Sequence, residues 1–262
     1  MYEGSNLSEG GLDSVGRHIL SEIKGALTHI PDQKAQGKIL QAVYLGIQLH
    51  QNQESRVDGP YPNHLLRVTR RILSGFEIQD PDVLAAAALH DSVEDQADTI
   101  VTLYPVAQDP RNMLTARENA FDYIRQHFGE GTEQIVRTVT EEGSGVPTQD
   151  EKHAPRMSAE DYIAVNIKHL PEAIRDVRVF YVKLSDFMDN ALQLGHIQDQ
   201  KDKYWYARKY ERAYPIYRER LREPDVEIPA DKKASIIDRL DMAEMYAKDV
   251  IAQYADWAGY GY

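Results

Sequence analysis

Apolar residues recur at intervals of three and four along most of the 262-residue sequence, and no stretch alternates cleanly between apolar and polar residues. Ile39, Val43 and Ile47 form one such stripe. This spacing is typical of α-helices that bury one face, whereas alternation is typical of strands. The run Val177–Leu184 looks strand-like, but helical patterns flank it, so we interpret it as a buried helix. The sequence therefore predicts an all-α bundle, in which sites form between facing helices.

Breaks in the pattern predict how the chain is organised. Residues 1–30 should form an N-terminal segment, mobile up to about Gly16, with a short helix. Residues 31–262 should form a single helical domain with a core over about 33–222 and a C-terminal helix over 230–258. The expected core helices cover residues 33–53, 64–75, 82–90, 116–128, 133–140, 158–170, 171–194 and 200–222, the last one kinked or split at Pro215. Irregular loops are expected at 98–110 and 141–156, and a loop as long as the second often covers a site.

Composition narrows the classes of protein that the chain can belong to. The formal net charge of -12 disfavours non-specific binding to nucleic acid, which depends on neutralisation of phosphates by Lys and Arg. No apolar run reaches the length of a membrane span. The absence of cysteine excludes disulfides and thiolate metal ligands. The N-terminus has neither a basic start nor an apolar stretch, so we expect a cytoplasmic protein that binds no membrane. A homo-oligomer is compatible with all of this.

The dipeptide His90-Asp91 ends a short, alanine-rich stretch that predicts a buried helix. Imidazole nitrogen and carboxylate oxygen together suit Mn, Fe or Zn. His64 begins another helix upstream, and Asp186 follows the run 182–184, where an acidic residue needs a partner such as a metal. We therefore predict a metal site formed by His64, His90, Asp91 and Asp186. Two carboxylates and two neutral imidazoles would balance a divalent ion and leave positions for water and a phosphate oxygen.

Two further carboxylates follow this dipeptide. Glu94 and Asp95 lie at i+4 from His90 and Asp91, which places each of them one helical turn beyond its partner. We expect this pair to transfer protons between water and a leaving group, and one of the two can instead orient a metal ligand.

Three blocks carry a resemblance to a known family, and they read HQNQESRVDGPYPNHLLRVTRRIL, DPDVLAAAALHDSVEDQADT and VKLSDFMDNALQL. In this order they resemble the hydrolase domain of the RelA/SpoT family, including the small alarmone hydrolases known as metazoan SpoT homologues. The resemblance covers roughly residues 50–194. It implies an HD-domain helical bundle, here with additional C-terminal helices, and removal of the 3′-pyrophosphate from (p)ppGpp.

The resemblance also implies roles for individual residues. His64, His90, Asp91 and Asp186 match the metal ligands of the family, whose usual ion is Mn²⁺, and Glu94 and Asp95 match its catalytic acidic pair. Arg56 matches an Arg that packs on the purine base, and Asn190 an Asn that contacts the sugar or its phosphates. A looser match in the helix 200–222 suggests Lys203, Arg208 and Tyr210 for the distal phosphates.

The chain departs from the family pattern at three places. Val57-Asp58 follow the loop Arg where a Lys is common, Asp189 precedes the Asn where His or Tyr is common, and Glu141 replaces a Lys. We interpret each change as the loss of a positive or neutral group near the phosphates. Such a loss would bear on which nucleotide binds, and less on whether a metal binds.

The resulting hypothesis is a metal-dependent (p)ppGpp 3′-pyrophosphohydrolase. A metal-bound hydroxide would attack the phosphorus attached to the ribose 3′-oxygen, and pyrophosphate and GDP or GTP would leave. One alternative is an HD phosphohydrolase for another nucleotide, such as ppApp, the 2′-phosphate of NADPH or a nucleoside monophosphate. Another is a non-catalytic nucleotide-binding regulator that kept the fold. A second, synthetase domain does not fit, because the chain after Leu194 is too short for it.

Overall fold

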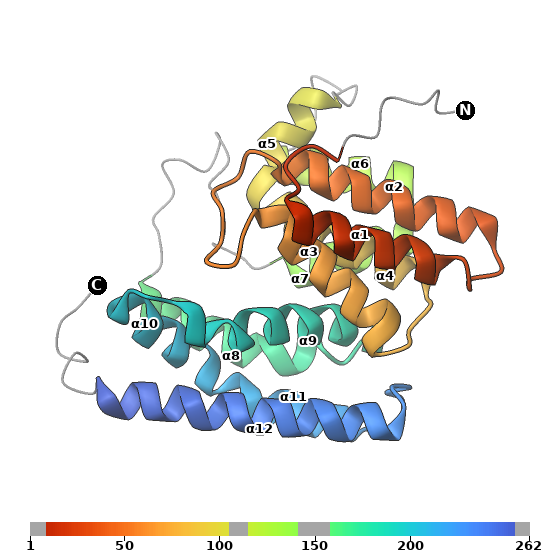
Figure 1. Cartoon of the computed structure of the whole chain (residues 1–262). Coiled ribbons are helices and arrows are strands. Elements are labelled where there is room, and N and C mark those ends of the chain that lie inside the picture. Colours follow the sequence, from red (N-terminus) through yellow and green to blue (C-terminus); the bar gives the residue numbers. More distant parts are fainter. Residues whose placement is uncertain (1–8, 105–114, 141–157, 255–262) are drawn as a thin grey trace.

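The structure, a computed structural model of the whole chain, describes residues 9–104, 115–140 and 158–254. Within these ranges the regular structure is helical, apart from an isolated bridge between Arg56 and Gly59. The all-α prediction is therefore confirmed (Figure 1). The α-helices are α1 (Ser14–Leu27), α2 (Gln33–His50), α3 (Tyr61–Arg70), α4 (Pro81–Leu89), α5 (Ser92–Leu103), α6 (Ala116–Phe128), α7 (Glu130–Val139), α8 (Ala159–Ala173), α9 (Val177–Leu192), α10 (Gln200–Glu211), α11 (Ala213–Leu221) and α12 (Ala230–Gln253). A π-helical turn, η1 (Arg71–Gly75), extends α3, and a 3₁₀ turn, η2 (Leu194–His196), follows α9.

Helix α4 lies at the centre of the bundle. Asp80 caps its N-terminus by accepting hydrogen bonds from two backbone N–H groups, and Pro81 occupies its first position. Every residue from Val83 to Leu89 is buried, because α2, α3, α7 and α9 surround the helix. The residues that follow Leu89 are therefore held at a fixed place in the interior.

The C-terminal helices form a separate layer in Figure 1, where the blue α12 runs along the lower edge beneath the teal α9 and α10. Helix α12 packs against α9, α10 and α11 through one face, which buries Ile236, Leu240, Ala247 and Val250. The expectation of additional C-terminal helices is thus confirmed, although α12 ends at Gln253 and not near residue 258.

Several helix boundaries differ from those expected. Residues 98–103 continue α5, where a loop was predicted, because Ile100 is buried and α5 packs on α6. Pro171 lies within α8, and α9 starts later, at Val177, where Asp176 supplies the cap. The remainder of the first predicted loop, 105–110, and the whole of the second, 141–156, lie outside the described residues.

The helical segment 200–222 is split, as predicted at Pro215, but the break falls at Arg212. Pro215 occupies the first turn of α11, where its missing N–H has no helical partner in any case. A proline there cannot continue the preceding helix, because its ring would clash with the carbonyl one turn earlier. The proline therefore sets the position of the break three residues before itself.

The N-terminal helix belongs to the same core. Helix α1 begins at Ser14, so residues 14–16 are helical where a mobile segment was expected, and Asp13 caps the helix through the Gly16 N–H at 2.8 Å. Its buried face packs on α3. The domain boundary near residue 30 stays a prediction. Among the described helices, none combines the length and the apolar character that crossing a membrane requires.

Candidate metal centre and active-site cavity

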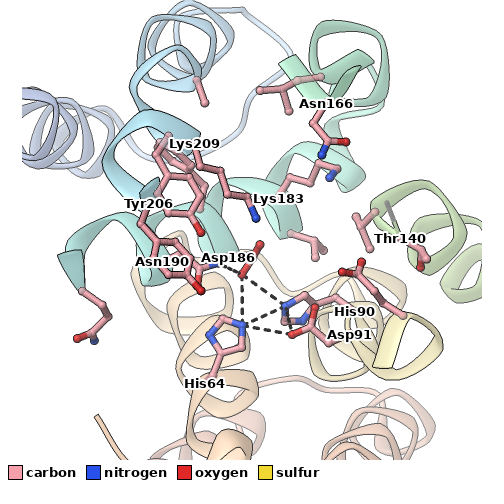
Figure 2. A pocket seen from close by; sticks show the side chains of 18 of the residues that line it. His64, His90, Asp91, Thr140, Asn166, Lys183, Asp186, Asn190, Tyr206 and Lys209 are labelled. Atoms are coloured by element: carbon pink, nitrogen blue, oxygen red, sulfur yellow. Dashed lines mark hydrogen bonds and ion pairs between the residues drawn. The ribbon is translucent and has the colours of Figure 1, made fainter. Parts of the chain in front are cut away.

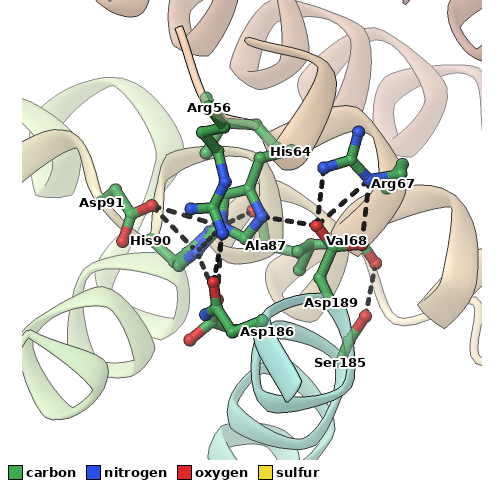
Figure 3. Close-up of polar contacts among 12 residues, drawn as sticks. Arg56, His64, Arg67, Val68, Ala87, His90, Asp91, Ser185, Asp186 and Asp189 are labelled. Carbon is green, nitrogen blue, oxygen red and sulfur yellow. Dashed lines mark hydrogen bonds and ion pairs between the residues drawn. The ribbon is translucent and has the colours of Figure 1, made fainter. Parts of the chain in front are cut away.

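The pair His90-Asp91 lies where the buried helix α4 ends and α5 begins. The Ala87 carbonyl oxygen, which can only accept, lies 2.8 Å from His90 Nδ1, so this nitrogen carries the proton and donates. In its neutral form the ring therefore presents an unprotonated Nε2 to the other side. Helix α3 supplies His64 and α9 supplies Asp186, so three elements converge on one point (Figure 3).

Polar atoms of these side chains lie within ligand distance of a common centre (Figure 2). His64 Nε2 lies 3.3 Å from His90 Nε2 and 3.2 Å from Asp186 Oδ1. His90 Nε2 lies 3.6 Å from Asp186 Oδ1 and 3.2 Å from Asp91 Oδ2, and the Asp91 oxygen lies 3.5 Å from His64 Nε2. Bonds of roughly 2.0–2.2 Å to a metal place neighbouring donor atoms about 3–3.6 Å apart.

The electrostatics of the cluster favour a bound cation. Burial and the Arg56 charge lower the pKa of His64, but hydrogen bonds to Asp186, Asp189 and Asp91 outweigh them and raise it to about 10. Burial likewise lowers the pKa of His90, yet the neighbouring carboxylates raise it above its ordinary value. Burial raises the pKa of Asp91 and Asp186, and the imidazoles hold both below the usual range.

An environment that draws protons onto two buried imidazoles has a strongly negative potential. A divalent cation compensates the same potential while both imidazoles stay neutral, which is the form that binds a metal. The atoms of His64, His90 and Asp186 all lie within 4.8 Å of one another, and Asp91 is close to both imidazoles. The donor set of two nitrogens and carboxylate oxygens therefore fits a divalent metal such as Mn, Fe or Zn.

Asp189, which we expected to influence which nucleotide binds, contacts His64 instead. Asp189 is buried in α9, and its Oδ2 lies 2.8 Å from His64 Nδ1. Its carboxylate also accepts hydrogen bonds from Arg67 at 2.8 Å and from Arg71 at 2.8 Å. The interpretation that Asp189 changes the phosphate environment is therefore wrong. It holds the His64 ring at the nitrogen that faces away from the cluster. The signal in the sequence was its position one helical turn after Asp186.

The loop departure at Val57-Asp58 has a similar explanation. Asp58 lies 2.6 Å from Arg67 Nη2, so its charge is directed to α3 and away from a phosphate. Backbone hydrogen bonds between Arg56 and Gly59, of 2.9 and 3.2 Å, close the loop. Gly59 has a φ of 126°, which favours glycine. The third departure, Glu141, lies outside the described residues.

The two carboxylates of the predicted acidic pair, Glu94 and Asp95, lie in different surroundings. Glu94 lines the cavity above the cluster. Asp95 instead accepts a hydrogen bond from Gln53 Nε2 at 2.8 Å, which holds it behind the site. The sequence did not single out Gln53, although it follows the buried His50 by three residues and lies 2.5 Å from that imidazole. Tyr61 donates to Asp91 Oδ2 at 2.8 Å and so orients a second ligand.

A cavity of about 940 Å³ opens over the cluster. Arg56 and Asn190 line it together, and the Arg56 guanidinium donates to the Asn190 side-chain oxygen. Tyr210 also lines it, whereas Lys203 does not, and Arg208 is held away by Glu160 at 3.0 Å.

Two lysines that the sequence analysis did not select, Lys183 and Lys209, line the cavity instead. The signal for Lys183 was its place one helical turn before Asp186, on the same face of α9. The roles of all the predicted site residues stay proposals.

The chain is similar to HD-domain proteins. The HD-domain family matches residues 42–215. The chain is similar to a curated relative from Xenopus tropicalis, guanosine-3′,5′-bis(diphosphate) 3′-pyrophosphohydrolase MESH1, with 29% identity over 158 residues, which cover 60% of this chain and 69% of the relative. The MESH1 of Danio rerio is 27% identical over 159 residues, with the same coverage.

A solved structure, described as a metazoan ortholog of SpoT that hydrolyzes ppGpp, covers 78% of this chain and 94% of its own, with a TM-score of 0.53 and 18% identity. At that identity the match supports the fold alone, and the fold is the one predicted. The HD-domain match, in contrast, spans well over half of the chain and includes every predicted metal ligand. The chain belongs to the HD-domain family and is a metal-dependent phosphohydrolase of this type.

Proposed function

We propose that this protein is a guanosine-3′,5′-bis(diphosphate) 3′-pyrophosphohydrolase that uses Mn²⁺. The observation that carries the proposal is the His64, His90, Asp91 and Asp186 cluster on the floor of a cavity that also presents Arg56 and Asn190. The curated MESH1 relatives, which share 27–29% identity with the chain, are named for this reaction. We extend their substrate to this chain, and we keep a cytoplasmic location and a homo-oligomer as compatible expectations.

The metal ligands are His64, His90, Asp91 and Asp186. A divalent metal held by them lowers the pKa of water and polarises a phosphoryl oxygen. In the reaction the oxygen of water forms a bond to the phosphorus on the ribose 3′-oxygen, and the bond from that phosphorus to the 3′-oxygen breaks. Pyrophosphate leaves, and the 3′-oxygen takes up a proton, so the other product is GDP from ppGpp, or GTP from pppGpp.

Side chains that line the cavity position the substrate and transfer the protons. Glu94 faces the cavity, so it is the carboxylate that accepts a proton from water and returns one to the 3′-oxygen. Asp95, held by Gln53, is a positioning residue behind it. Arg56 offers a planar, weakly hydrated guanidinium for stacking on the purine base. Its contact with Asn190 keeps both groups at the same side of the cluster.

The test is release of pyrophosphate from ppGpp and ppApp, and of phosphate from NADPH, by the full chain with and without Mn²⁺. We expect Mn²⁺-dependent release from ppGpp, with turnover lost in an Asp91→Ala variant. Turnover of only ppApp or NADPH would assign the site to another nucleotide. Binding of ppGpp without turnover of any of the three would favour a regulatory protein and contradict the proposal.

A further inference from the structure

Helix α12 carries an exposed apolar patch, which consists of Met242, Met245 and Tyr246. The exposed fractions of these side chains are 68%, 64% and 40%. The other large exposed apolar side chains of the described residues lie singly on four different segments. Single exposed apolar residues are common on protein surfaces, but three of them within little more than one helical turn indicate a contact surface.

The helix that carries the patch lies beyond residue 215, where the match to the HD-domain family ends. In Figure 1 it runs along the lower edge of the molecule, and its buried face packs on α9, α10 and α11. None of its residues lines the cavity over the His and Asp cluster. Neither the packing of the described helices nor the proposed reaction therefore uses the patch.

The patch belongs to a longer stripe along one face of α12. Six exposed residues of the stripe follow one another at alternating intervals of four and three, and they are Ser235, Arg239, Met242, Tyr246, Asp249 and Gln253. Two helices that pack along a common seam in a coiled coil show this spacing. The stripe covers most of the 24-residue helix, a length of roughly 27 Å.

The stripe is complementary to itself when the direction of the helix is reversed. Its residues form three pairs, and the two members of each pair lie equally far before and after position 244. In an antiparallel pair of α12 helices centred there, Met242 lies level with Tyr246 of the second copy. Arg239 likewise lies level with Asp249 of the second copy. Each contact occurs twice, because the same surface of both copies forms a two-fold interface.

The two charges of the stripe select the antiparallel orientation. Arg239 and Asp249 are exposed, and among the described residues neither has an oppositely charged side chain within ion-pair distance. Partial burial of its side chain and the nearby charge of Arg71 lower the pKa of Arg239, so an acidic partner would stabilise it. A parallel pair would instead place equal charges opposite each other, and their repulsion disfavours that arrangement.

We propose that two copies of this chain associate through α12, as an antiparallel pair of helices around a two-fold axis. The apolar patch forms the centre of the interface, and an Arg239–Asp249 pair on each side fixes the register. Methionine and tyrosine are enriched at such interfaces. One helix from each copy gives a contact at the small end of specific interfaces, so we expect a Kd of roughly 1–100 µM. The inference is independent of the proposed function.

The test is sedimentation equilibrium of the full chain at concentrations of roughly 1–200 µM, which requires no substrate. Arg239→Asp and Asp249→Arg each replace two attractive pairs by two repulsive ones, so each should weaken the dimer about tenfold or more. The variant with both substitutions reverses every pair and should restore the parent Kd to within about threefold. The matched control is Glu219→Arg, an equal change of charge at an exposed position of α11, which should leave the Kd unchanged.

Three outcomes would contradict the proposal. The parent chain could remain monomeric over the whole range of concentration. It could form a dimer that neither single charge variant weakens, which would place the interface elsewhere. The single variants could weaken the dimer without restoration in the combined variant, which would exclude the antiparallel register. Thermal unfolding of each variant separates a loss of association from a loss of folded protein.

A distance tests the orientation separately. The chain contains no cysteine, so Ser235→Cys accepts one spin label in each copy. In the antiparallel pair the two labels lie at opposite ends of the contact, about 27 Å apart along the helix axis. Pulsed electron paramagnetic resonance measures this separation in a concentrated sample. A separation close to the distance between packed helix axes, about 10 Å, would show a parallel pair and contradict the proposal.

Discussion

Asp189 shows how one residue outside the proposed ligand set can determine the state of a proposed metal ligand. A carboxylate bound to Nδ1 of an imidazole fixes the tautomer and the direction of the ring, and it makes the other nitrogen a better donor to a metal. Asp189 occupies this position for His64, at 2.8 Å. Arg67 and Arg71 in turn hold Asp189, so the arrangement carries no uncompensated charge.

The first prediction concerns Asp189→Asn. Because an amide can donate to His64 Nδ1, the tautomer is no longer fixed, and we expect Mn²⁺ affinity to fall by about 10–100-fold. Some stability is also lost, because two arginines lose their charged partner. Metal affinity is measured by calorimetry on folded protein. Asp58→Asn is the control, since Asp58 contacts Arg67 but not His64. Equal losses of affinity in both variants would mean that Asp189 acts only through Arg67.

The cluster of proposed ligands could be predicted from sequence because each residue adjoins a local helical or apolar pattern and its chemistry is specific. His90-Asp91 follows an apolar helix, and Asp186 follows an apolar run. The spacing of Asp189 from Asp186 is visible in the sequence, but its partner His64 lies 125 residues away. Its contact with His64 could not be predicted, because it depends on the packing of α3 on α9. The direction of Lys209, on the same helix as the predicted Lys203 and Arg208, likewise depends on how α10 lies on its neighbours.

At the scale of elements, the position of the proposed metal ligand His90 depends on the close packing of α2 on α4. Gly46 of α2 faces the backbone of α4, and a Cβ there would lie 2.4 Å from the Ala88 carbonyl oxygen. Ala88 lies two residues before His90. The absence of a side chain at Gly46 therefore lets the two helices approach, and this approach sets the place of His90.

We predict that Gly46→Ala destabilises the protein by about 1–3 kcal/mol, the usual range for overpacking, and also weakens Mn²⁺ binding. Gly37, in the same helix, has open space around its Cα. Gly37→Ala should therefore stabilise by about 0.5–1 kcal/mol through helix propensity alone. Chemical denaturation measures both changes. A Gly46→Ala variant as stable as Gly37→Ala would show that the helices can separate without loss.

The helices themselves could be predicted because their apolar stripes are strong, whereas their ends depend on tertiary contacts. Residues 99–102 are all β-branched, which disfavours a helix, yet the burial of Ile100 and the packing of α6 keep them helical. Pro171 suggested a helix start, but α8 continues past it to Ala173. For α5, a contact between segments distant in the sequence thus decided where the helix ends.

At the scale of the whole molecule, the site joins two parts of the chain. His64, His90 and Asp91 come from the α3–α5 region, and Asp186 comes from α9, nearly a hundred residues later. Only the packing of α9 on α3 and α4 brings them together. A metal that binds all four links these parts in the folded state, and the unfolded chain holds no such arrangement. Metal binding must therefore stabilise the fold as a whole.

The last prediction is that Mn²⁺ raises the thermal midpoint of unfolding. A ligand at 100 times its Kd stabilises by about 2.7 kcal/mol, which corresponds to roughly 5–10 °C for a chain of this size. EDTA should reverse the rise, and Ca²⁺ should not replace Mn²⁺, because imidazole ligands select against it. Asp186→Asn removes the ligand that comes from α9 and should abolish most of the shift. If Mn²⁺ raised the midpoint equally in this variant, the ion would bind elsewhere, and the two parts of the chain would be held together by packing alone.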